Sequence, residues 1–176
     1  SGTTSKLLAN EKDIRVIAYG AMVTEMPDGR VLMNNRAILT PSGAPDSEAR
    51  FARLVNVYAQ DLRFTLDQLE RANAGEGPFG KRFAGRLDLV RVGLFGHSTG
   101  GAAVFQACGQ DSRCRAVVGQ DPVTTGVDAT IASRGLTQPS LSFFSKDYLD
   151  SPSDKRTVSM LQAGKSDGYR IGIPTA

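Results

Sequence analysis

The chain has 176 residues, of which 40% are hydrophobic and 22% are charged, values that exclude a disordered or fibrous protein and fit one soluble globular domain. Its 21 basic and 18 acidic residues leave a formal charge of +3, too small and too dispersed to indicate a nucleic-acid-binding surface. No apolar run approaches the ~20 residues that a membrane-spanning helix needs. We therefore expect a single domain over residues 1–176, with no transmembrane segment and no nucleic-acid partner.

The first part of the chain gives mixed signals. Residues 14–18 form a short apolar, branched run that is typical of a strand. Residues 20–45 contain turn and loop residues, at 26–30 and at 41–45, and predict a mostly irregular surface segment. Hydrophobic residues then recur at spacings of three and four over residues 46–74, which predicts a long helix with one buried face.

Short apolar runs alternate with helix-forming segments over the rest of the chain, after a loop at 75–80. We expect strands at 89–95, 115–121, 141–145 and 169–174, and helices at 102–108, ended by Gly109, and at 153–163, capped by Ser153. This alternation predicts an α/β fold with a mostly parallel sheet and helices on both faces. The run at 89–95 has no polar alternation, so we expect this strand to be buried on both faces.

The two cysteines of the sequence, Cys108 and Cys114, flank the loop between a predicted helix and a predicted strand. Their spacing suits a disulfide, which would favour an extracellular, oxidising location. Two reduced thiols in a cytoplasmic protein are the alternative. No histidine lies near them, so we expect no metal site there.

The motif with chemical content is Gly-His-Ser-Thr-Gly at residues 96–100, centred on Ser98. A strand is predicted before it and a helix after it, the context in which a serine occupies a strained turn that exposes its hydroxyl. We expect Gly96 and Gly100 to be required because a side chain would crowd this turn, and Gly101 to let the helix pack closely. The N–H of Thr99, at the helix N-terminus, is the expected oxyanion donor. A plain strand–turn–helix connection without chemistry is the alternative.

Two acidic residues after Ser98 follow predicted strands and are candidates for orienting a catalytic histidine. Asp121 closes the strand at 115–121, and Asp147 follows the strand at 141–145. Both fit the order of serine, acid and histidine expected in this fold, and the carboxyl ends of parallel strands meet at one edge of the sheet. Each could instead be a solvated loop carboxylate.

The sequence contains one histidine, His97, directly before the nucleophile candidate. Neighbouring residues in a tight turn point in different directions, so we expect His97 to pack or to line a pocket rather than to accept the Ser98 proton. A serine hydroxyl needs a base to become an effective nucleophile. The sequence as it stands therefore provides a nucleophile and an acid but no base.

Two segments carry a resemblance to a known family: Asp-Leu-Arg-Phe-Thr-Leu-Asp-Gln-Leu at 61–69 and Gly-Arg-Leu-Asp-Leu-Val-Arg-Val-Gly-Leu-Phe-Gly-His-Ser-Thr-Gly-Gly at 85–101. They resemble the platelet-activating-factor acetylhydrolase group, close to the dienelactone-hydrolase-like and cutinase-like enzymes. The resemblance implies the α/β-hydrolase fold. In the acetylhydrolase group the acid follows the strand after the nucleophile helix, which favours Asp121, whereas the cutinase-like pattern places it near Asp147.

The resemblance also implies which catalytic parts to expect outside these residues. In such enzymes a strand like residues 169–174 leads directly into the catalytic histidine, and the sequence stops at Ala176. Relatives also begin with further strands and a loop that supplies a second oxyanion donor. We therefore expect a partial α/β-hydrolase domain, truncated at both ends.

Together these patterns predict a serine carboxylic ester hydrolase acting on short-acyl or lipid-like esters, with a role such as lipid degradation. No metal or organic cofactor is expected, because this chemistry needs neither. A non-catalytic domain that binds a ligand or partner, and an acyltransferase using the same nucleophile, are the alternatives. The sequence leaves the exact ester and the oligomeric state open.

Overall fold

The computed structural model describes residues 23–25, 31–33 and 44–174. The chain divides into two compact units, Ser1–Ser42 and Gly43–Ala176. The strand expected at 14–18 lies outside the described residues.

The first unit contains a short strand pair that the sequence did not predict. Strand β1 (Val23–Glu25) pairs antiparallel with β2 (Val31–Met33), with Val23 opposite Met33. The two strands flank the turn expected at residues 26–30. The prediction of a mostly irregular segment was therefore wrong at these two strands, which are too short to give a clear alternating pattern.

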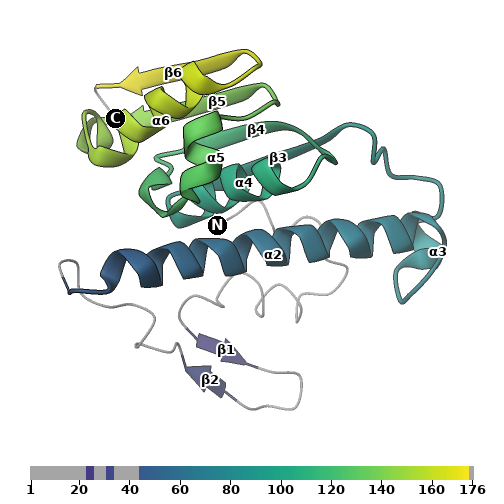
Figure 1. Ribbon diagram of the computed structural model, residues 1–176. Coiled ribbons are helices and arrows are strands. Elements are labelled where there is room, and N and C mark those ends of the chain that lie inside the picture. The colour runs from purple at the N-terminus through teal and green to yellow at the C-terminus, as the bar shows by residue number, and fades with distance from the viewer. Residues whose placement is uncertain (1–22, 26–30, 34–43, 175–176) are drawn as a thin grey trace. The chain divides into compact units, whose positions relative to one another are not determined.

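The second unit is built on a parallel four-stranded sheet, drawn in teal to yellow in Figure 1. Its strands are β3 (Val92–His97), β4 (Cys114–Gln120), β5 (Ser140–Ser145) and β6 (Gly168–Ile173), in the order β3-β4-β5-β6. All neighbouring strands run parallel. The four strands predicted after residue 80 and their parallel pairing are confirmed.

The helices of the second unit match the predicted ones and add short ones. They are α2 (Ser47–Asn73), α3 (Gly80–Phe83), α4 (Thr99–Gln110), α5 (Ala129–Arg134) and α6 (Pro152–Ala163), with 3₁₀ turns η2 (Thr124–Gly126) and η3 (Lys146–Tyr148). The helix after Ser98 continues through Gly109, which packs closely against Ile131 rather than ending the helix. Ser151, not Ser153, caps α6 by accepting a hydrogen bond from Asp154 N–H.

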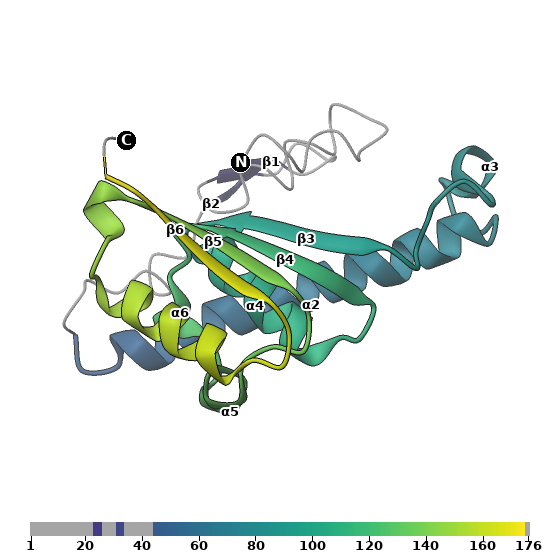
Figure 2. The same ribbon diagram turned by 90° about the horizontal axis from the view of Figure 1, so that it is seen from above.

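Helices α2, α4, α5 and α6 lie on one side of the sheet, as the view from above shows (Figure 2). The sequence analysis expected helices on both faces of the sheet. Within residues 44–174, the helices that pack on the sheet cover one face. Strand β3 alternates between half-buried and exposed residues, and Phe95 is 44% exposed. The prediction that this strand is buried on both faces was wrong for the described part of the chain.

The hydrophobic core lies between the sheet and these helices. It includes Val55 of α2, Phe105 of α4, Val117 of β4 and Met160 of α6. The long helix contributes its buried face as the three-and-four spacing predicted, and α4 is buried along most of its length because it is packed between α2 and the sheet. Among the described helices, none is long and apolar enough to cross a membrane.

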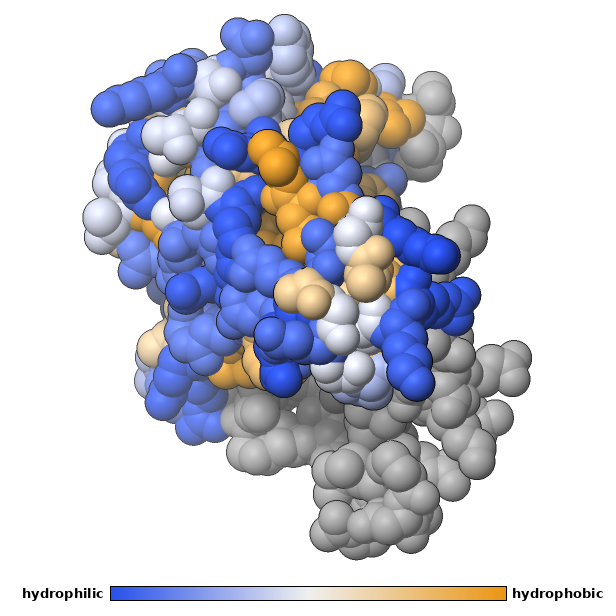
Figure 3. All heavy atoms as spheres, turned by 90° about the vertical axis from the view of Figure 1, so that its right-hand side faces the viewer, coloured by the Kyte–Doolittle hydropathy of each residue, from blue (hydrophilic) through white to orange (hydrophobic). Residues whose placement is uncertain are grey.

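The surface at the amino ends of the strands is mainly hydrophilic, with a small apolar patch (Figure 3). Lys81, Arg82 and Arg86 are exposed in and after α3. The carboxyl ends of the strands lie at the opposite edge of the sheet, and the candidate residues gather there.

A disulfide joins Cys108, near the end of α4, to Cys114, the first residue of β4. Both cysteines are buried in the core cluster. Of the two alternatives left open by the sequence, the structure has the disulfide. The bridge fixes the connection between the helix that follows Ser98 and the strand that precedes Asp121.

Replacing both cysteines by alanine is expected to lower the free energy of unfolding by about 2 kcal/mol, because the bridge closes only a short loop. Urea denaturation of the oxidised wild type and of the double variant measures the difference. Wild type in dithiothreitol is the matched control and should resemble the variant. Equal stability of the wild type with and without the reductant would contradict the prediction.

Candidate active site

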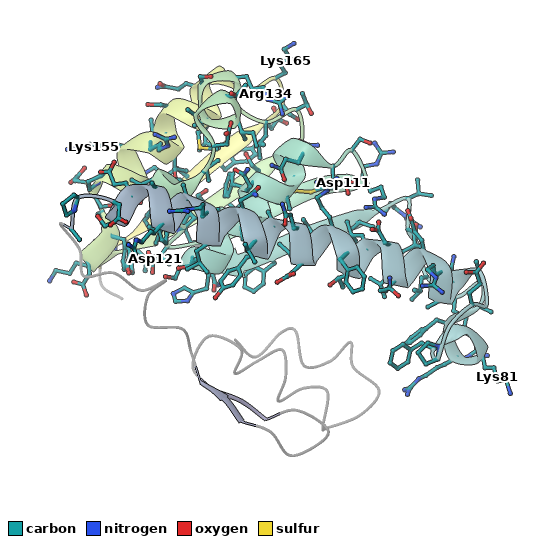
Figure 4. The ribbon with its side chains drawn as sticks, turned by 60° about the horizontal axis from the view of Figure 1, so that its bottom comes forward. Lys81, Asp111, Asp121, Arg134, Lys155 and Lys165 are labelled. Carbon is teal, nitrogen blue, oxygen red and sulfur yellow. A yellow bond between two sulfur atoms is a disulfide. The ribbon has the colours of Figure 1, made fainter. Side chains whose placement is uncertain are left out.

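Ser98 and Asp121 directly follow neighbouring parallel strands, β3 and β4. Parallel strands end at the same edge of a sheet, so the two residues are placed side by side in the topology. In Figure 4 the labelled Asp121 lies at the end of the sheet opposite to Asp111 and Lys81. The structure thus brings together two residues that the sequence analysis selected.

The backbone of Ser98 is strained. Its φ is 55° and its ψ is −122°, and it stands between the last residue of β3 and the first residue of α4. Its N–H donates to Gln120 O at 2.9 Å, and its carbonyl accepts from Val123 N–H at 3.1 Å and from Ala102 N–H at 3.2 Å. A non-glycine residue in the left-handed region costs energy and persists only where its surroundings hold it. Here the hydrogen bonds with the end of β4 and with Val123 just after it hold the turn.

The glycines around Ser98 differ in how much space they have. A Cβ on Gly96 would lie 2.2 Å from Gly100 O, and a Cβ on Gly101 would lie 2.8 Å from Pro122 Cα. A Cβ on Gly100 would meet nothing within 4 Å. The predicted crowding is confirmed at Gly96, and the close packing at Gly101 is also confirmed. The expectation for Gly100 was wrong, because its Cα faces open space.

Gly101→Ala is expected to lower the free energy of unfolding by about 1–3 kcal/mol, since the new methyl group would force α4 away from Pro122. Gly100→Ala, one residue earlier in the same helical turn, should stay within about 0.5 kcal/mol of the wild type. Thermal or urea denaturation of the two variants makes the comparison. A Gly101→Ala protein as stable as the Gly100→Ala protein would contradict the packing seen at Pro122.

Thr99 is the first residue of α4 and is half-buried. The first N–H groups of a helix have no acceptor within the helix, and the helix dipole places partial positive charge at this end. The Thr99 N–H is therefore placed beside Ser98 where a developing negative charge could be bound. Its role as oxyanion donor stays a prediction.

Asp121 is held by the next strand of the sheet. Its N–H donates to Phe143 O at 2.8 Å, and its Oδ1 accepts from Ser145 N–H at 2.7 Å. Its φ is 42°, so it too lies in the left-handed region. Within residues 44–174, its Oδ2 accepts no hydrogen bond, which leaves one oxygen for another donor. A carboxylate anchored through one oxygen is suited to orienting an imidazole with the other.

Asp147 has a different environment. It lies in η3 after β5, its side chain is exposed, and none of the described residues donates a hydrogen bond to it. The structure therefore provides an anchor for Asp121 and none for Asp147.

His97 is exposed as the last residue of β3, on the alternate positions that also expose Phe95. It lies opposite Gln120 in the strand pairing, and no described contact joins it to Ser98. Sequence reasoning missed the residues that hold the site through backbone groups, namely Gln120, Val123 and Ser145. No sequence signal marks them, because main-chain hydrogen bonds do not depend on side-chain type.

Among the described residues, no group of three or more His, Cys, Asp and Glu side chains is placed to hold a metal ion. The candidate groups are thus a hydroxyl, helix N–H groups and a carboxylate. That donor set is suited to nucleophilic attack on a carbonyl and to stabilising the resulting oxyanion.

A parallel sheet with a serine on a strained strand-to-helix turn defines the α/β-hydrolase fold. Comparisons with known proteins agree with this fold. The chain is 32% identical over 113 residues to the platelet-activating factor acetylhydrolase of Cavia porcellus, an alignment that covers 64% of this chain and 22% of that protein. It also resembles the structure of a ferulic acid esterase from Streptomyces cinnamoneus, with a TM-score of 0.63 and 23% identity.

The structural match covers 88% of this chain and 40% of the esterase chain, so this chain spans less than half of either relative. No family model matches it. The second unit therefore has the fold of an α/β hydrolase, as the resemblance seen in the sequence implied.

Proposed function

We propose that this chain is the nucleophile-bearing part of a serine carboxylic ester hydrolase. The observation that carries the proposal is the conformation of Ser98, with φ 55°, on the turn between β3 and α4. Strained non-glycine residues cluster at functional sites, and nothing in the packing of a plain connection requires a serine in this conformation. The neighbouring Asp121, also strained and anchored, adds the second group.

The proposed reaction has two stages. The Ser98 Oγ attacks the ester carbonyl while a histidine of the full-length protein other than His97 takes the hydroxyl proton. The carbonyl oxygen becomes an oxyanion, which accepts a hydrogen bond from Thr99 N–H, and the bond to the leaving alcohol breaks as the histidine returns the proton to that alcohol. Water then attacks the acyl-enzyme, again with the histidine as base, and releases the acid and free Ser98.

Asp121 has the role of orienting that histidine and stabilising its protonated form. The support is the hydrogen bond from Ser145 N–H to one carboxylate oxygen, at 2.7 Å. Asp147 lacks such an anchor among the described residues, which favours Asp121 as the acid. His97 is left with a packing or pocket-lining role beside the nucleophile.

The relatives' names support the substrate class that we propose. One relative is an acetylhydrolase and the other an esterase, which supports esters with short acyl groups, including lipid-like ones. The disulfide between Cys108 and Cys114 supports an oxidising, extracellular location for the reaction.

Labelling of the full-length protein with a fluorophosphonate probe tests the proposal. We expect one adduct, mapped to Ser98 by peptide mass spectrometry, and none in Ser98→Ala. Ser112→Ala, which changes an exposed serine in the α4–β4 loop, should label like the wild type. No adduct on Ser98 would overturn the proposal and favour a non-catalytic binding domain. Product analysis with an added alcohol would separate hydrolysis from acyl transfer.

A further inference from the structure

An ion pair joins α6 to β6; its acidic side chain is buried and its basic side chain is 33% exposed. Arg170 of β6 donates from Nε to Asp154 Oδ1 at 2.7 Å and from Nη2 to Asp154 Oδ2 at 2.5 Å. The Asp154 side chain is only 3% exposed. The Arg170 guanidinium holds the pKa of Asp154 below its ordinary value, so the carboxylate is charged at neutral pH. Removing one partner of a buried carboxylate is destabilising, because the charge is then left without compensation.

Asp154 has further partners in the segment that follows β5. Its Oδ2 accepts from Asp150 N–H at 2.9 Å, and its own N–H donates to Ser151 Oγ at 3.1 Å. Asp150 has a φ of 61° and is, with Ser98 and Asp121, one of three described non-glycine residues with positive φ. The Asp154 carboxylate therefore joins the strained Asp150, after β5, to β6, while the main-chain N–H of Asp154 is bound by the cap of α6.

That segment begins at Ser145, the residue whose N–H anchors Asp121. Leu149 N–H donates to Ser145 O at 3.1 Å, which closes residues 145–149 into a compact turn. On its other side, Ser145 pairs with Ile173 of β6, the strand that carries Arg170. Both routes from Ser145, along the chain to Asp150 and across the sheet to β6, reach Asp154.

We propose that Asp154 is a positioning residue for ester hydrolysis: through Asp150 and Arg170 it holds Ser145 where its N–H fixes the Asp121 carboxylate. The inference rests on the proposed function. It predicts that weakening the ion pair between Asp154 and Arg170 lets the Asp121 carboxylate move, and with it the histidine that this carboxylate orients. No group that touches the substrate is removed. A misplaced carboxylate stabilises the protonated histidine less, so the pKa of that histidine falls.

The chain offers a matched control at the opposite end of the sheet. Asp111 accepts two hydrogen bonds from Arg113 Nε and one from its Nη2, and its side chain is 9% exposed. The Arg113 guanidinium likewise holds the pKa of Asp111 below its ordinary value. Asp111→Asn thus weakens the same kind of ion pair in the loop between α4 and β4, away from the end of the sheet that carries Asp121.

The test compares Asp154→Asn with Asp111→Asn in the full-length protein, using a p-nitrophenyl ester of a short acid. We expect Asp154→Asn to lower kcat about tenfold or more with little change in KM, since small displacements of catalytic groups cost rate. The acidic limb of its kcat–pH profile should move to lower pH, because the histidine loses its proton at a lower pH. Asp111→Asn should have a kcat within about twofold of the wild type, and the acidic limb of its kcat–pH profile should not move.

Equal kcat and an unmoved limb in the two variants would overturn the inference while the wild type stays active and labels at Ser98. A wild type that neither hydrolyses esters nor labels would instead overturn the proposed function, and this inference with it. If Asp154→Asn does not fold, Arg170→Lys takes its place, since it keeps the charge but loses the paired hydrogen bonds. The same loss of kcat and the same shift of the limb are then expected.

Discussion

Ser98→Ala is expected to lower kcat for ester hydrolysis by about 10⁶-fold, the size of effect that removal of a serine nucleophile has in a triad enzyme. The methyl group keeps the shape of the turn but cannot form the acyl-enzyme. Hydrolysis of p-nitrophenyl acetate by the full-length protein measures the effect. Far-ultraviolet circular dichroism of the variant should be unchanged, because the hydrogen bonds that hold residue 98 come from its backbone.

Ser112→Ala is the control for this experiment and should keep kcat within about twofold of the wild type, since this serine is exposed in the α4–β4 loop. A Ser98→Ala protein that retains wild-type hydrolysis would show that another residue is the nucleophile. The geometry of the turn would then need a different explanation.

Asp121→Asn is expected to lower kcat by about 10⁴-fold, as loss of the charge does in other triads. Asparagine has nearly the same shape, and its carbonyl oxygen can still accept the hydrogen bond from Ser145 N–H, so the fold should be preserved. What is lost is the charge that stabilises a protonated histidine and selects its tautomer. Steady-state kinetics on the same ester measures the loss.

Asp147→Asn is the matched control, because it removes a carboxylate from the end of the next strand without removing any described hydrogen bond. Its kcat should stay within about threefold of the wild type. The reverse result, a large loss in Asp147→Asn and a small one in Asp121→Asn, would assign the acid to Asp147, as the cutinase-like pattern implies.

The fold was predictable where the pattern of hydrophobic residues within a single segment indicates a helix or a strand. The spacing of Val55, Leu62 and Leu66 marks the buried side of α2, and the apolar runs mark all four strands of the sheet. Helix α5 was missed because its six residues are too few to show a period, although Asp128 caps it by accepting from Thr130 N–H at 2.8 Å. Strand β3 was predicted as buried on both faces because the run at 89–95 is apolar apart from Arg91. Its exposed Phe95 shows that composition alone does not say which face is covered.

The candidate site was predictable only in part, for a related reason. The motif selects Ser98 as a candidate, and a position after a predicted strand selects both Asp121 and Asp147, because these signals are local in the sequence. The anchor of Asp121 is the main-chain N–H of Ser145, which lies one strand further along the sheet. A main-chain group can make this bond whatever the side chain is, so the sequence does not indicate it. The contrast between Gly100 and Gly101 likewise depends on where Pro122 lies in space.

The parallel order of the sheet has a consequence for how the site is assembled during folding. Adjacent strands of β3 to β6 are separated by helices, so no pair can close as a hairpin, and each pairing brings together distant parts of the chain. The N–H of Ser98 bonds to Gln120 at the end of β4, and its carbonyl accepts from Val123 just beyond. A nascent chain that has emerged from the ribosome only as far as α4 therefore contains the whole serine motif but lacks the strand that locks its shape. The strained conformation of Ser98 therefore forms late, when the strands of the sheet have paired.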